Sequence, residues 1–143
     1  MTNVCQRFNK IVDSYHRYQT LTTLSLWHQQ IGHVIAQSLA NALKHNKTLT
    51  ELYLGGNPIG DSGAQSLGNA LQHNKALTKL DLWDCELGHV IAQSLAIALQ
   101  YNTTLTTLNL WNNQIGDVGA QSLANTLQHN RVIIILPLSI QCL

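Results

Sequence analysis

The most constraining feature of the sequence is a set of leucines that recur every 28 residues, at Leu21, Leu49, Leu77 and Leu105. A similar pattern of apolar and polar residues surrounds each of these leucines. A fixed period of about 20–50 residues is typical of a solenoid, in which each copy forms one supersecondary unit and stacks on the next. The sequence therefore predicts four full units, at residues 20–47, 48–75, 76–103 and 104–131.

The second unit shows what each copy is made of. Leu52 and Leu54 alternate with polar or aromatic neighbours, and this period of two predicts a short strand with one buried face. Glycine, asparagine and proline follow and predict a turn, and Asp61 is a favourable N-cap for a helix. Apolar residues then recur along one narrow helix face, at Ala64, Leu67, Gly68 and Leu71.

Stacking explains how such a unit becomes stable. One strand and one helix cannot bury both of their apolar faces, whereas stacked copies can. The strands would pair into a parallel sheet, and the helices would form an outer layer. Because a strand is narrower than a helix, the stack is expected to curve with the sheet on the concave face and the helices on the convex face. The sequence thus predicts an α/β horseshoe solenoid.

The repeated pattern resembles the leucine-rich repeat, in the ribonuclease-inhibitor-like subtype that has a full helix in each unit. The residues of the second unit that carry the resemblance are Leu49, Leu52, Leu54, Asn57, Ile59, Gly60, Gly63, Ala64, Leu67 and Leu71. The chain is similar to the repeat arrays of nucleotide-binding immune receptors. The resemblance implies a protein that binds other proteins through such a face.

A half unit is predicted at each end of a single domain, residues 1–143. Residues 1–19 have apolar side chains at helical spacing, namely Phe8, Ile11, Val12 and Tyr15. They predict a helix that covers the open end of the core, the alternative being a frayed leader. Residues 132–143 predict one more strand, in which Pro137 indicates an edge. An apolar, exposed terminal strand favours self-association, and the lack of a helix after it leaves open that the chain is a fragment of a longer array.

The first and third units depart from the second and fourth in the same way. Ile35 and Ile91 replace a glycine, and His33 and His89 replace the aspartate of the predicted N-cap. The alternation indicates that the array grew by copying a pair of units. Helices in the first and third units are expected to start less cleanly.

Composition narrows the class of function. Charged residues are 10% of the chain and the net charge is +1, with no basic stripe, so neither nucleic acid nor a membrane is a predicted partner. No signal peptide or long apolar run is evident, which predicts a cytoplasmic protein. The three cysteines are scattered and do not indicate a disulfide framework. His45, His73 and His129 recur at the helix ends, at most one per unit, where they suit the helix dipole, so no metal or other cofactor is predicted.

The candidate site lies on the predicted concave face, where strand side chains that miss the core form rows about 4.8 Å apart. All three tryptophans fall in one row, with Gly55 expected to leave a notch between Trp27 and Trp83. Trp83 and Trp111 are expected to stack. Tryptophan is a preferred interface anchor, and polar residues would form the rim. The candidate protein-binding residues are Trp27, Glu51, Tyr53, Lys79, Asp81, Trp83, Asp84, Asn109 and Trp111. The alternative is that the tryptophans fold over the turn and pack its rim.

The remaining residues favour structural roles. Asn57 and Asn113 resemble the asparagine ladder of leucine-rich repeats, and Gln29 and Cys85 occupy the same position in their units. Cys85 is therefore predicted to be structural and not a nucleophile. Glu51 and Lys79 are expected to form an exposed cross-strand pair, which contributes little to stability. No nucleophile, carboxylate pair or metal cluster recurs at a catalytic spacing, so the chain is not predicted to be an enzyme.

These observations favour a non-catalytic protein–protein interaction scaffold that binds a protein on its concave face. One alternative is a regulator of a GTPase, similar to a Ran GTPase-activating protein, although members of that branch are longer and carry an acidic tail. Another is a fragment of a larger immune-receptor-type sensor.

Overall fold

The computed structural model describes residues 21–128 and 130–135, and strands and helices alternate throughout them. The strands are β1 (Thr23–Ser25), β2 (Glu51–Tyr53), β3 (Lys79–Asp81), β4 (Thr107–Asn109) and β5 (Ile133–Ile135). The helices are α2 (His33–His45), α3 (Gly60–His73), α4 (His89–Tyr101) and α5 (Gly116–Leu127). The half-unit helix predicted within residues 1–19 lies outside the described residues, whereas β5 confirms the additional strand after the fourth unit.

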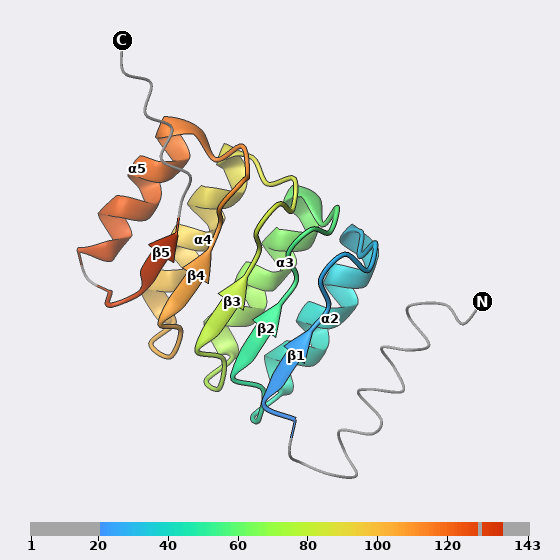
Figure 1. Cartoon of the computed structure of the whole chain (residues 1–143). Helices are drawn as coiled ribbons and strands as arrows, with labels where there is room; N and C mark the ends of the chain where they lie inside the picture. The colour runs from blue at the N-terminus through green and yellow to red at the C-terminus, as the bar shows by residue number, and fades with distance from the viewer. Residues whose placement is uncertain (1–20, 129, 136–143) are drawn as a thin grey trace.

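The strands form one parallel sheet in the order β1-β2-β3-β4-β5. The predicted register is confirmed, since Glu51 pairs with Lys79 and Tyr53 pairs with Asp81. Figure 1 shows the strands side by side in chain order, with the helices packed against one face as a second layer. Helices are about 10 Å wide and strands pair about 4.8 Å apart, so the helical layer lies on the outside of the curve. The predicted α/β solenoid is confirmed.

Leucines at equivalent positions fill the space between the two layers. Leu52, Leu80 and Leu108, at the centres of β2, β3 and β4, have no exposed surface. Leu67 and Leu95 face them from α3 and α4 and are equally buried. Each such side chain stabilises the fold by about 1.5–3 kcal/mol relative to an exposed position. The two apolar faces of the second and third units are therefore buried by their neighbours, as the repeat period requires.

The predicted asparagine ladder is confirmed beside the strands. Asn57 Oδ1 accepts hydrogen bonds from the backbone of Gln29 (2.9 Å) and Ile31 (3.1 Å), one unit earlier. Its Nδ2 donates to the carbonyls of Leu26 (2.8 Å) and Leu54 (2.6 Å). Asn113 makes the equivalent contacts to the third unit. Each asparagine thus satisfies the turn of the preceding unit and fixes the distance between the two.

A second ladder, absent from our prediction, follows the helices. Its members also recur every 28 residues, at Asn46, Asn74, Asn102 and Asn130. Asn102 is buried; its Nδ2 donates to the carbonyls of Leu71 (2.7 Å) and Asn74 (3.2 Å). Its Oδ1 accepts from the backbone of Thr104 (3.0 Å) and Leu105 (2.7 Å). The ladder therefore links the C-terminus of one helix to the next unit.

The turns between strand and helix alternate between two conformations, as the sequence does. In the first and third units, Gln30 and Glu86 take left-handed φ values of 57° and 59°. In the second and fourth, Gly60 and Gly116 take the left-handed value, 63°. All four units carry glycine at this position, but only Gly60 and Gly116 are left-handed, whereas Gly32 and Gly88 have extended backbone.

The predicted N-cap role of Asp61 is wrong. None of the four described helices has a side-chain cap hydrogen bond at its N-terminus. Because α3 already begins at Gly60, Asp61 lies inside the first turn, and its Oδ1 instead accepts a hydrogen bond from the backbone N–H of Gly88 (2.8 Å). Gly88 is the residue before α4, so Asp61 helps to start the next helix. The helices of the first and third units begin one residue later in their units, at His33 and His89.

Glycines also pair the helices. A Cβ on Gly63 would lie 2.9 Å from the Cβ of Ala36, and one on Gly119 would lie 2.8 Å from that of Ala92. These glycines therefore let α3 approach α2 and α5 approach α4 closely. At the equivalent position of α4, which packs against α3, the residue is Ile91, and its side chain is buried. The alternation of glycine and isoleucine between units thus corresponds to an alternation of close and wider packing between neighbouring helices.

Candidate functional site

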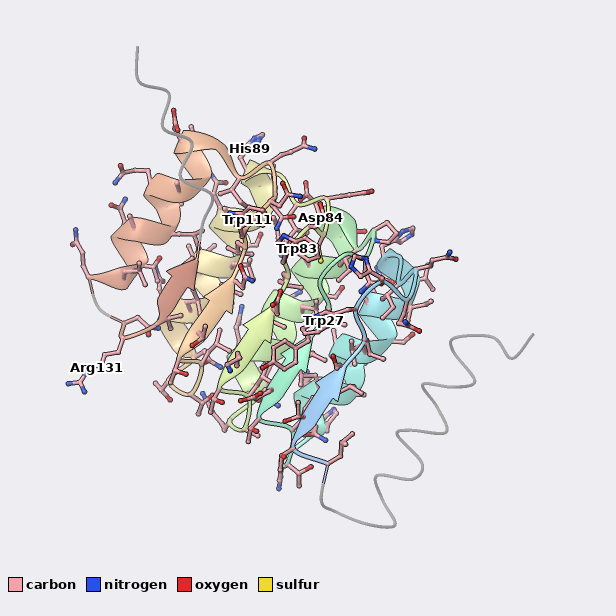
Figure 2. The ribbon with its side chains drawn as sticks, viewed as in Figure 1. Trp27, Trp83, Asp84, His89, Trp111 and Arg131 are labelled. Carbon is pink, nitrogen blue, oxygen red and sulfur yellow. The ribbon has the colours of Figure 1, made fainter. Side chains whose placement is uncertain are left out.

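The three tryptophans directly follow β1, β3 and β4 at the same edge of the sheet, and Figure 2 shows them above the strands. Backbone hydrogen bonds continue beyond the strands and align this edge, for example from Gly56 N to the carbonyl of Trp83 (2.8 Å) and from Asp84 N to that of Trp111 (3.0 Å). Trp27 is 50% exposed and Trp111 is 47% exposed, whereas Trp83 is partly buried. Two large aromatic surfaces therefore face solvent.

The rings contact one another in two groups. Trp83 and Trp111 stack with ring centroids 6.2 Å apart and an interplanar angle of 17°, which confirms the predicted stacking. Trp27 lies edge-on to Tyr53 at 5.4 Å. His28 lies edge-on to Trp83 at 5.7 Å and extends the Trp83–Trp111 group toward Trp27, its neighbour in the chain. We refer to Trp27, His28, Tyr53, Trp83 and Trp111 as the aromatic row.

The notch predicted at Gly55 is wrong, because the side chain of Trp83 fills it. Gly55 is buried, and a Cβ on it would lie 3.1 Å from Trp83 Cε3. At Gly56, which has a φ of 69°, a Cβ would overlap the ring of His28. The two glycines thus provide the room in which His28 and Trp83 meet. Sequence reasoning missed His28 as a site residue, although its place opposite Gly56 was a usable signal.

Beside Trp27, Glu51 and Lys79 form an ion pair, and the phenol of Tyr53 hydrogen-bonds to both. Lys79 Nζ lies 3.4 Å from Glu51 Oε1, which confirms the predicted cross-strand pair. Tyr53 Oη donates to Glu51 Oε2 (2.7 Å) and accepts from Lys79 Nζ (3.3 Å). The pKa of Glu51 is lowered, mainly by the hydrogen bond that it accepts from Tyr53. The pKa of Lys79 is raised, most by its hydrogen bond to Tyr53 and next by the negative charge of Glu51. Lys79 Nζ also lies 5.8 Å from the centroid of the Tyr53 ring.

Beside Trp83 and Trp111, the carboxylates have only neutral partners. Asp81 accepts hydrogen bonds from the backbone of Trp83 (2.9 Å) and from Asn109 Nδ2 (3.2 Å). Asp84 Oδ1 accepts from Asn112 Nδ2 (2.8 Å). Over residues 21–128 and 130–135, the ion pair between Glu51 and Lys79 is the one salt bridge. The carboxylates of Asp81 and Asp84 therefore remain electrostatically unneutralised at the aromatic row.

Asn109 orients the end of the aromatic row. Its Oδ1 accepts a hydrogen bond from the backbone of Trp111 (3.0 Å), as Asp81 does from Trp83. The structure thus brings eight of the nine predicted site residues into two sets of contacts, one of Trp27, Glu51, Tyr53 and Lys79 and one of Asp81, Trp83, Asn109 and Trp111. The ninth, Asp84, follows Trp83 in the chain and accepts a hydrogen bond from Asn112. The contacts between side chains hold the row in a defined shape before any partner binds.

Chemically reactive groups are scarce near the row. Cys85 is buried; its Sγ donates to the carbonyls of Leu54 (3.4 Å) and Trp83 (3.3 Å), and burial raises the pKa of the thiol to about 12. A thiol in this state is a poor nucleophile at neutral pH. In the described part of the chain, no cluster of three or more His, Cys, Asp or Glu residues could hold a metal ion. The helices found there are too short or too polar to cross a membrane.

The fold and the repeated ladders define a leucine-rich repeat solenoid. A family model described as "Leucine Rich repeat" matches residues 45–68 and 101–124, which contain the strands β2 and β4 and fall mainly in the second and fourth units. These are the units that carry a glycine at the close helix contacts.

Two solved structures are similar to the chain as a whole. Leiomodin-1 Actin-Binding Site 2 matches with a TM-score of 0.86 and 19% sequence identity, over 98% of this chain and 83% of the other. The tropomodulin C-terminal domain of Caenorhabditis elegans matches with a TM-score of 0.77 and 14% identity, over 89% of this chain and 80% of the other. At such identities the likeness shows the fold alone. No curated protein sequence matches the chain.

Proposed function

We propose that the chain is a non-catalytic protein–protein interaction scaffold that binds a protein partner on its concave face. The single observation that carries this proposal is the aromatic row, in which Trp27 and Trp111 leave about half of their surfaces in solvent. Tryptophan is enriched among the residues that dominate binding energy, because one side chain buries a large area at a small loss of conformational freedom.

Preorganisation supports the same conclusion. The stack of Trp83 on Trp111 and the contact of Trp27 with Tyr53 restrict the rings before binding. A partner would therefore lose less free energy in ordering these side chains than on a flexible surface. Polar groups from Glu51, Lys79, Asp81, Asp84 and Asn109 surround the rings. An apolar centre with a polar rim is the anatomy of a protein-binding surface.

The fold is consistent with this role. The full helix in each of the four described units supports the ribonuclease-inhibitor-like subtype. The proposal also takes residues 1–143 as a single domain. The similar leiomodin-1 structure is named as an actin-binding site. Purified actin is therefore the first defined partner to test. A cytoplasmic location would suit such a partner.

Affinity capture from cell extract tests the proposal, with a variant that changes Trp27, Trp83 and Trp111 to alanine. A matched control changes Val34, Val90 and Val118 to alanine, because these side chains are at least as exposed as Trp27 and Trp111 but lie on the helices. Circular dichroism first establishes that all three proteins are folded. We expect one set of proteins to be captured by the native chain and the valine variant and lost by the tryptophan variant. Equal capture by the tryptophan variant would move the site away from the concave face.

The alternative of a GTPase regulator is tested directly. The purified chain is added to a Ran-type GTPase, and the rate of GTP hydrolysis is measured. A scaffold of the kind proposed leaves this rate unchanged, whereas stimulation would favour the alternative.

A further inference from the structure

We propose that the segment recognised at the aromatic row is basic and presents an arginine, whose guanidinium packs against Trp111 and pairs with the carboxylate of Asp81 or Asp84. This inference rests on the proposed function and gives the chemistry of its partner. Figure 2 shows Asp84, Trp83 and Trp111 gathered at one end of the row.

The molecule contains a satisfied version of the same arrangement. At the other end of the row, Glu51, Tyr53 and Lys79 form an acid–aromatic–cation cluster, with an ion pair of 3.4 Å and the ammonium 5.8 Å from the ring centroid. The cation there comes from the chain itself. It neutralises the carboxylate and donates a hydrogen bond to the phenol oxygen of the same cluster.

The second cluster has the acid and the aromatic rings but lacks the cation. Asp81 and Asp84 receive hydrogen bonds from backbone and amide groups, which carry no net charge. A carboxylate offers about four acceptor sites, so each of them can still accept a charged donor. Asp84 is exposed, and Asp81 is half-buried next to the Trp83–Trp111 stack. The missing component is therefore a cation supplied by a partner.

The geometry favours arginine over lysine. Trp111 is about half exposed and already stacks on Trp83, with an angle of 17° between the two rings. A planar guanidinium can continue this stack and donate several hydrogen bonds from its edge at the same time. An ammonium group offers neither planarity nor a bidentate edge. An acidic segment would meet two unneutralised carboxylates and is disfavoured.

Peptide binding tests the inference. The probe is a short fluorescent peptide in which arginine alternates with glycine, and binding is measured by anisotropy at low salt. Matched peptides replace arginine with lysine or with citrulline, which keeps the shape but removes the charge. We expect the arginine peptide to bind about two- to fivefold more tightly than the lysine peptide, as expected for an exposed cation–π contact. The citrulline peptide should not bind measurably.

Variants then locate the contact. The double variant Asp81→Asn with Asp84→Asn should weaken binding of the arginine peptide by about fivefold or more, within the range expected for two exposed ion pairs. Glu86→Gln is the control, since it removes a carboxylate of the same turn that has no place in the row. It should change affinity by less than about twofold.

The outcomes separate this inference from the proposed function. Equal binding of arginine and citrulline peptides, no measurable binding of the arginine peptide, or equal effects of the double variant and Glu86→Gln would overturn the basic partner. If the tryptophan variant still loses a captured protein in that case, the scaffold stands and its partner has other chemistry. If the arginine peptide binds as expected but the tryptophan variant captures every protein that the native chain does, the proposed function fails.

Discussion

At the scale of single residues, the asparagines after the helices carry stability out of proportion to their size. Asn102 is buried, and its side chain makes five hydrogen bonds that link the third unit to the second and the fourth. Asn102→Ala would leave buried carbonyl and N–H groups without partners, at about 1–3 kcal/mol for each unsatisfied group. We expect a loss of about 3 kcal/mol in the free energy of unfolding, measured by urea titration. Asn69→Ala, at an exposed position of α3, is the matched control and should be neutral or slightly stabilising.

Two glycines allow a test of backbone conformation with the same substitution. Gly60 has a φ of 63° and nothing lies within 4 Å of a Cβ built on it, so Gly60→Ala is opposed by backbone strain alone. That strain is about 1–2 kcal/mol. Gly68 is helical, and its Cβ would meet ordinary contacts from 3.7 Å. Gly68→Ala should therefore stabilise the protein by about 0.5–1 kcal/mol. Thermal unfolding of both variants measures the difference, and changes of the same sign would contradict this account.

The buried thiol predicts a dependence on pH. The pKa of Cys85 rises from an ordinary 9.0 to about 12 on folding, because burial disfavours the thiolate. Above pH 9 the unfolded chain releases this proton while the folded chain retains it, so the free energy of unfolding falls as pH rises. The decline should reach about 1.4 kcal/mol per pH unit between pH 9 and pH 12. Cys85→Ala removes this contribution, and an identical slope in the variant would show that Cys85 does not cause it.

Several residue contacts were predictable from the sequence, and the reasons for the failures are physical. Trp83 and Trp111 are one period apart on adjacent strands, so their stacking followed from the register. The filled notch at Gly55 did not, because the spacing does not fix the rotamer that places the Trp83 ring over Gly55. Asp61 fits an N-cap by residue type, but the left-handed Gly60 advances the start of α3 and turns the carboxylate to the next unit. Rotamers and turn conformations of this kind are not encoded in a spacing.

At the scale of whole elements, the alternation between glycine and isoleucine sets how closely the helices pack. Gly119→Ala would place a Cβ 2.8 Å from both the Cβ of Ala92 and Cγ2 of Ile115. The helix α5 must then move away from α4, and overpacking of this type costs about 1–3 kcal/mol. Urea unfolding should show the loss, with Gly68→Ala as the control for helix propensity. A stabilised Gly119→Ala variant would mean that α5 adjusts its position freely.

The length and order of the elements were well predicted, because the repeat period constrains them four times over. Strand positions followed from the alternation around residues such as Leu52 and Leu80, and all strands pair in the expected register. The second asparagine ladder was missed although its period is equally regular. A polar residue after a helix is also consistent with an ordinary solvent-exposed turn, and only burial, as at Asn74, distinguishes the two.

At the scale of the whole molecule, a solenoid derives its stability from contacts between adjacent units, so the position of a mutation along the array matters as much as its type. Leu80 is fully buried at the centre of β3, whereas Leu24, its equivalent in β1, is partly buried. Leu80→Ala should cost about 2–5 kcal/mol, and Leu24→Ala should cost clearly less. Hydrogen exchange should show the largest loss of protection in β2, β3 and β4 for Leu80→Ala and a loss confined to β1 and β2 for Leu24→Ala. If Leu24→Ala were as damaging as Leu80→Ala, or accelerated exchange uniformly, stability would not be distributed by neighbouring units, and the array would fold as one globular core.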